Sequence, residues 1–169
     1  LRYLERRKRL IDAVCFSGGE PTLREELPEM LRSVKELGLK TKLDTNGTRP
    51  DVLQRLVRDG LVDYIAMDVK APPEKYSTVC GCTVDIQAVE RSVQLIKESG
   101  VQYEFRTTAH PALLTERDFL RICAWINGAA RYVIQACRTG VCLDPEFQML
   151  PPAEPQWLES VSKLCIPHF

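Results

Sequence analysis

The chain has 169 residues, 44% of them hydrophobic and 27% charged, which is enough for one globular domain with an apolar core. Its 23 basic and 23 acidic residues give a formal net charge of +0, which argues against nucleic acid and anionic membrane surfaces as partners. The longest apolar runs fall far short of the length of a membrane-spanning helix, so no membrane partner is expected.

Strand-like and helix-like apolar spacings alternate along the chain. Residues 1–10 predict a helix that is already under way at Leu1, and we interpret the sequence as a fragment of a longer protein. Short apolar runs then predict strands, at 13–16, 40–43, 61–70, 101–107 and 130–136. Apolar residues at helical spacing predict further helices, at 27–37, 50–59, 85–99, 115–125 and 156–164.

This alternation is typical of βαβ units and predicts an α/β fold with a parallel sheet. Because such a sheet is covered on both faces, we expect its strands to be apolar throughout. Residues 1–150 form the predicted α/β core, and residues 151–169 form a proline-rich C-terminal segment with a short helix.

The seven cysteines are odd in number and irregularly spaced, which favours free thiols in a reducing cytoplasm over a disulfide framework. Cys15 lies in an apolar run and Cys123 on an apolar helical face, so both are expected to be buried. Four more cysteines form two closely spaced pairs. Cys80 and Cys82 make a C-x-C pair, and Cys137 and Cys142 make a C-x4-C pair. Neither spacing is a strong zinc or iron–sulfur motif, so the role of these four stays open.

The most informative stretch is Ser17-Gly-Gly-Glu-Pro, which follows the first predicted strand and precedes a helix. Adjacent glycines at Gly18 and Gly19 allow the backbone to approach a ligand closely, and Glu20 adds a carboxylate. Such a turn suits a small zwitterion. The alternative is a tight strand-to-helix turn that binds nothing.

Polar residues also follow the other predicted strands, at Asp44–Gly47, Asp68, Lys70, Arg106–Thr108 and Gln135. Each has an ordinary explanation by itself, such as a turn or a solvated strand end. Because ligands of parallel α/β folds bind at the carboxyl ends of the strands, their recurrence there predicts a shared binding site.

The segments FSGGEPTL, LDTNGT, VDYIAMDVKAP and EFRTT together resemble the radical SAM superfamily. They are most similar to activating enzymes of glycyl radical proteins, first the anaerobic ribonucleoside-triphosphate reductase activating protein and next pyruvate formate-lyase activating enzyme. The resemblance covers residues 13–108 and is thinner beyond them.

The resemblance implies a partial α/β barrel with a [4Fe–4S] cluster held by a C-x3-C-x2-C loop. S-adenosylmethionine chelates that cluster, and its reductive cleavage gives a 5′-deoxyadenosyl radical that abstracts hydrogen from a glycine of a partner protein. The implied partners are therefore a glycyl radical enzyme, either an anaerobic ribonucleotide reductase or a formate-lyase relative, and an electron donor such as flavodoxin or ferredoxin.

Five residues of the first two motifs match cofactor contacts of that family. Gly18, Gly19 and Glu20 match the turn that receives the methionine amino group, with Gly19 the best-supported contact. Asp44 and Asn46 match the Asp-Thr-Asn-Gly segment near the polar groups of the cofactor.

The later motifs supply the remaining expected contacts. Asp68, Val69 and Lys70 match a strand end beside the cofactor, where Lys70 neutralises its carboxylate. Arg106 matches an arginine that faces the cofactor or the incoming glycine loop, and Gln135 is our expectation for the last strand.

The sequence departs from the family because it contains no C-x3-C-x2-C. We expect the cluster cysteines upstream of Leu1, assign no catalytic or metal-ligating residue here, and predict an inactive fragment of an active parent. Alternatives are a cluster-free binding or scaffold protein, a radical SAM enzyme that acts on a small molecule, and an aldolase-type barrel with Lys70 as Schiff-base nucleophile. The last is disfavoured because the neighbouring Asp68 stabilises the charged ammonium.

Overall fold

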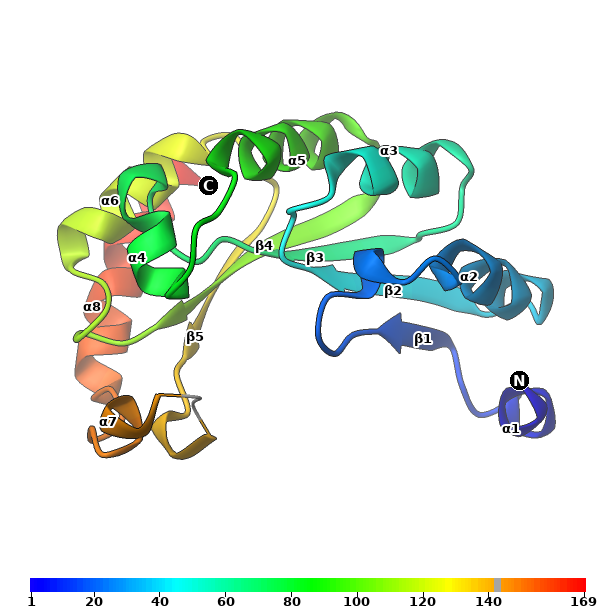
Figure 1. Ribbon diagram of the computed structural model, residues 1–169, viewed down its shortest axis with the longest axis horizontal. Helices are drawn as coiled ribbons and strands as arrows, with labels where there is room; N and C mark the ends of the chain where they lie inside the picture. The colour runs from blue at the N-terminus through cyan, green and yellow to red at the C-terminus, as the bar shows by residue number, and fades with distance from the viewer. Residues whose placement is uncertain (142–143) are drawn as a thin grey trace. The chain divides into compact units, whose positions relative to one another are not determined.

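The computed structural model describes residues 1–141 and 144–169, so Cys142 lies outside the described residues (Figure 1). In the described part of the chain, five strands form one sheet in the order β1-β2-β3-β4-β5. They are β1 (Ala13–Phe16), β2 (Lys40–Thr45), β3 (Tyr64–Asp68), β4 (Gln102–Ala109) and β5 (Tyr132–Ala136). The pairs β1/β2, β2/β3 and β4/β5 are parallel, which confirms the predicted α/β class.

The longer helices lie where apolar spacing predicted them: α1 (Arg2–Arg7), α2 (Leu27–Glu36), α3 (Pro50–Arg58), α5 (Ile86–Glu98), α6 (Glu116–Trp125) and α8 (Pro155–Cys165). Six short helices among the described residues were not predicted: η1 (Pro21–Leu23), η2 (Pro73–Lys75), α4 (Tyr76–Cys80), η3 (Thr139–Val141), α7 (Pro145–Gln148) and η4 (Ile166–His168). They are too short to show a helical period. None of the described helices has the length and apolarity needed to cross a bilayer.

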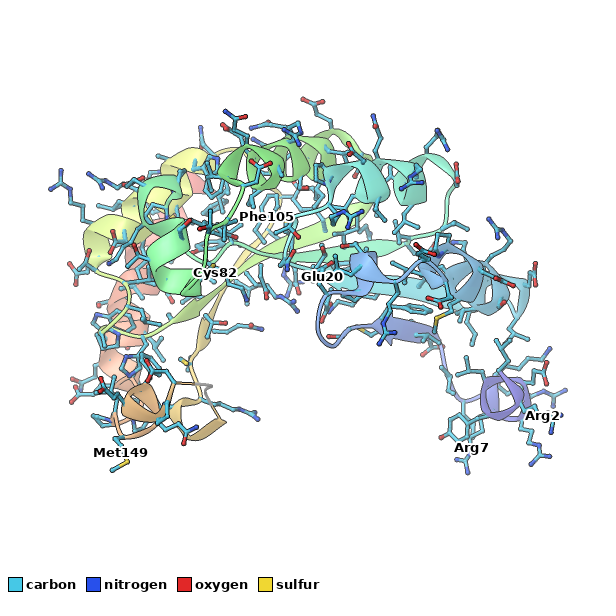
Figure 2. All side chains as sticks on the ribbon, in the orientation of Figure 1. Arg2, Arg7, Glu20, Cys82, Phe105 and Met149 are labelled. Atoms are coloured by element: carbon cyan, nitrogen blue, oxygen red, sulfur yellow. The ribbon has the colours of Figure 1, made fainter. Side chains whose placement is uncertain are left out.

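Contacts divide the chain into two compact units, one of residues 1–68 and 85–104 and the other of residues 69–84 and 105–169. Each unit has its own core of fully buried side chains. In the first they include Leu31, Leu43, Leu53, Ile65 and Val89. In the second they include Phe105 (Figure 2), Leu114, Phe119, Ile122 and Ile126. The division into residues 1–150 and 151–169 stays a prediction.

The expectation that Cys15 is buried is wrong, because its side chain is exposed. It lies on β1, which pairs only with β2 among the described strands and alternates between exposed and half-buried residues. Cys123 is buried as predicted, and so is Cys165 on α8. A hydrogen bond with Cys165 and then burial raise the pKa of the Cys123 thiol well above its ordinary value.

Asp118 joins the start of α6 to the segment before α4 within the second unit. Its Oδ2 accepts a hydrogen bond from Lys75 Nζ at 2.8 Å, and its side chain is only 11% exposed. Thr115 N–H and Oγ1 donate to the same oxygen at 2.8 and 2.9 Å, completing the capping box that the sequence predicts. Burial raises the pKa of Asp118, but the bonds from Lys75 and Thr115 outweigh it and lower that pKa overall.

We expect the Asp118→Asn variant to lose about 2 kcal/mol of unfolding free energy at pH 7, because asparagine resembles the protonated acid. The carboxyl of Asp118 has a lower pKa in the folded protein than in the unfolded chain, where an aspartate titrates at about 3.9. Its ionised form therefore stabilises the fold fully above that pH, and this stabilisation is lost as the pH falls through the pKa of the folded state. Urea unfolding at pH 7 and pH 3 measures the difference between the two proteins. A difference that does not shrink at pH 3 would contradict this account.

Candidate functional site

The turn after β1 exposes its backbone. Gly18 has φ +92° and Gly19 has φ +57°, conformations that favour glycine. A Cβ built on either residue would meet no atom within 4 Å, so the space above both is open. The turn therefore presents peptide groups that a small polar ligand can approach closely.

Glu20, labelled in Figure 2, directly follows the glycine turn, and both oxygens of its carboxylate accept hydrogen bonds from residues at the end of β2. Its Oε2 accepts from the Asn46 N–H at 2.7 Å, and its Oε1 accepts from Thr45 Oγ1 at 2.8 Å. The same Oε1 accepts from Thr22 N–H at 3.2 Å and Thr22 Oγ1 at 2.5 Å, which caps η1. Glu20 thus holds the glycine turn against the Asp-Thr-Asn-Gly loop.

The Asp-Thr-Asn-Gly loop is fixed by its own side chains. Asn46 Oδ1 accepts from the Thr48 N–H at 3.0 Å and from Thr48 Oγ1 at 2.7 Å. Gly47 has φ +74°, and Ser92 Oγ on α5 donates to its carbonyl at 2.7 Å. The loop that carries Asn46 is accordingly held by side-chain hydrogen bonds and is not merely a solvated turn.

Asp44 lies in a network that our sequence analysis missed, which we call the Lys42 network: Lys42, Asp44, Tyr64 and Glu104. Lys42 Nζ is 3.3 Å from Asp44 Oδ1 and 3.9 Å from Glu104 Oε1. Tyr64 OH donates to Glu104 Oε2 at 3.0 Å. Lys42 and Asp44 alternate with buried residues along β2, but their partners Tyr64 and Glu104 lie on other strands, so only the strand pairing reveals the network.

In the second unit, both the N–H and the carbonyl of Val69 form hydrogen bonds with residues of β4. Its N–H donates to the Arg106 carbonyl at 2.7 Å, and its carbonyl accepts from Thr107 Oγ1 at 2.6 Å. Tyr132 OH donates to Thr107 Oγ1 at 2.7 Å, and burial, which exceeds the effect of this bond, raises the pKa of Tyr132. Val69 is fully buried and these bonds fix the strand end, while its contact with a cofactor stays a prediction.

The other expected site residues are accessible to different degrees. Asp68 in the first unit is half-buried, and so are Lys70 and Arg106 in the second. Gln135 is exposed on β5, in register with Thr108 of β4. The structure thus groups Gly18, Gly19, Glu20, Asp44 and Asn46 in the first unit, and Val69 with Arg106 in the second.

The two cysteines of the C-x-C pair lie at the end of α4, where Gly81 has φ +66° (Figure 2). Burial and the neighbouring Cys82 raise the pKa of the half-buried Cys80, and Lys70 lowers it. Over residues 1–141 and 144–169, no three cysteine, histidine or carboxylate side chains gather to hold a metal ion.

The model of the Radical SAM superfamily matches residues 1–126. A protein of Methanocaldococcus jannaschii assigned as a glycyl-radical enzyme activating enzyme is 35% identical over 159 residues, 91% of this chain and 66% of that protein. An Fe-coproporphyrin III synthase of Methanosarcina barkeri is 31% identical over 122 residues, 65% of this chain and 30% of that protein. This chain therefore spans only part of both relatives.

The fold is similar to that of a crystallised domain of pyruvate-formate lyase-activating enzyme from Bacteroides vulgatus. The two agree with a TM-score of 0.72 at 15% identity, over 92% of this chain and 93% of that domain. This likeness confirms the expected fold class of a parallel α/β sheet of the radical SAM type.

Proposed function

This chain belongs to the radical SAM superfamily, and from that premise we propose that it forms part of a glycyl-radical-enzyme activating protein. The observation that carries the proposal is the glycine turn. Its two glycines have positive φ and open surroundings. The carboxylate of Glu20, which follows them, accepts a hydrogen bond from the Asp-Thr-Asn-Gly loop and also caps η1. A turn held in this way can offer its carbonyl groups to an ammonium without reorganising.

The residues present fit S-adenosylmethionine by their chemistry. The carbonyls of the turn, through Gly18 and Gly19, and the carboxylate of Asp44 accept from an ammonium, while Lys70 supplies a cation for the carboxylate of the cofactor. Glu20 and Val69 hold these groups in position through the bonds already described. Asn46, Asp68, Arg106 and Gln135 complete the proposed set of cofactor-side residues.

When bound, the cofactor and a reduced [4Fe–4S] cluster supply the radical that removes a hydrogen atom from a partner glycine. The residues of this chain do not hold the cluster, since the sequence lacks C-x3-C-x2-C. We therefore assign to the chain the binding and orientation of S-adenosylmethionine alone.

The finer assignments belong to the same proposal. The partner is a glycyl radical enzyme, either an anaerobic ribonucleotide reductase or a formate-lyase relative, and the electron donor is a flavodoxin or ferredoxin. The many free cysteines fit a reducing cytoplasm as the compartment.

Anaerobic reconstitution of the protein from its complete reading frame, with iron and sulfide, tests the proposal. We expect a brown protein that converts S-adenosylmethionine to methionine and 5′-deoxyadenosine when a reductant is added. We expect the Gly19→Ala variant to bind the cofactor at least about tenfold more weakly, since a side chain would occupy the open turn. Gly60→Ala is the matched control, because Gly60 has φ +64° and equally open surroundings but lies outside the turn. A complete protein that stays colourless would contradict the proposal.

A second candidate function is the modification of a small molecule, which the similarity to the Fe-coproporphyrin III synthase favours. The two functions separate in one assay. If a glycyl radical enzyme is the partner, a glycyl radical signal appears in that protein by electron paramagnetic resonance. If it is not, 5′-deoxyadenosine forms without that signal.

A further inference from the structure

The Lys42 network places one ammonium near two carboxylates of the first unit, Asp44 on β2 and Glu104 on β4. Lys42 Nζ lies 3.3 Å from Asp44 Oδ1 and 3.9 Å from Glu104 Oε1, within ion-pair distance of both. The side chains of Asp44 and Glu104 are 19% and 13% exposed, so water screens these charges less than it would on an open surface. The position of Lys42 therefore affects how much negative charge Asp44 presents to another cation.

Tyr64 orients the other carboxylate of the network. Lys42 and Tyr64 are paired in the register of β2 and β3, and Lys42 Nζ lies 5.6 Å from the centre of the Tyr64 ring. Tyr64 OH donates to Glu104 Oε2, which directs Oε1 toward Lys42. Glu104 and Asp44 consequently interact with the same ammonium, and the hydrogen bond from Tyr64 holds Glu104 in the orientation that allows this.

We infer that Lys42 and Glu104 are positioning residues that set the strength with which Asp44 attracts the ammonium group of S-adenosylmethionine. The inference rests on the proposed function, in which Asp44 receives that group. Lys42 partly neutralises Asp44, and Glu104 limits that neutralisation because it shares the same ammonium, 3.9 Å from its Oε1. Removal of the two charges must therefore change cofactor affinity in opposite directions.

The experiment is calorimetric binding of S-adenosylmethionine to the protein from its complete reading frame. Lys42→Met keeps the aliphatic stem without the charge, and we expect it to bind about fivefold more tightly. Glu104→Gln keeps the shape without the charge, and we expect it to bind about fivefold more weakly, with Tyr64→Phe weaker by a smaller factor. Lys35→Met is the matched control, because it breaks a different lysine–carboxylate pair, with Asp63 at 2.8 Å.

A second ligand separates positioning from folding. 5′-Methylthioadenosine lacks the amino-acid part of the cofactor, so its affinity should be the same in the wild type, Lys42→Met and Glu104→Gln. Equal losses for both ligands, or shifts of the same sign in the two variants, would overturn the inference while the proposed function stands. A complete protein that does not bind S-adenosylmethionine would overturn the proposed function and this inference with it.

Discussion

Replacing Glu20 with alanine is expected to lower the free energy of unfolding by about 4 kcal/mol and to abolish the binding of S-adenosylmethionine. The carboxylate accepts four hydrogen bonds, two of them from the Asn46 N–H and Thr45 Oγ1 at the end of β2. Hydrogen bonds to a charged acceptor contribute about 1.5–3 kcal/mol each, and the truncated side chain leaves their donors without it. The glycine turn then loses its attachment to the Asp-Thr-Asn-Gly loop.

Urea unfolding and calorimetric binding measure the two effects. Glu25→Ala is the matched control, because it removes an exposed carboxylate a short distance along the same segment. Glu20→Gln is expected to fall between the wild type and Glu20→Ala, since an amide keeps one good acceptor oxygen. If Glu20→Ala and Glu25→Ala lose the same free energy, the bridging role of Glu20 is wrong.

The order and class of the main elements could be predicted because they follow from local periodicity. The run Ala13–Phe16 forms β1 with the predicted bounds, and Asp85 caps α5 through Ala88 N–H at 3.1 Å as expected. What local pattern does not reveal is which face of a strand is covered. Cys15 belongs to an apolar run, yet it is exposed, because β1 has one neighbouring strand among those described.

Local sequence pattern also fails to show which strands are neighbours, and for that reason the Lys42 network was not predicted. We expected strands that are apolar throughout, and β3 approaches that, but β2 alternates between buried and accessible residues. Lys42 and Glu104 are distant in sequence and meet only when β2 and the beginning of β4 are folded in the first unit. Which residues face a cofactor stays a prediction from the motifs, while the charged partners of those residues depend on strand pairing that the sequence does not display.

The Gly47→Ala variant is expected to lose about 3 kcal/mol of unfolding free energy, for two reasons that add. Gly47 has φ +74°, where a side chain costs about 1 kcal/mol, and a Cβ there would lie 2.1 Å from Met67 Cε and 2.9 Å from its Sδ. Met67 is fully buried, so the end of its side chain must rearrange within the core to make room, and overpacking of this kind costs about 1–3 kcal/mol.

Two comparisons separate these contributions in urea unfolding. Gly100→Ala has nearly the same backbone conformation, φ +71°, with nothing within 4 Å of the new Cβ, so it should lose only about 1 kcal/mol. In a Met67→Ala background the obstructing atoms are absent, and Gly47→Ala should then also cost about 1 kcal/mol more than Met67→Ala alone. If the cost of Gly47→Ala is unchanged in that background, the packing of Met67 against the loop does not determine why glycine occupies this position.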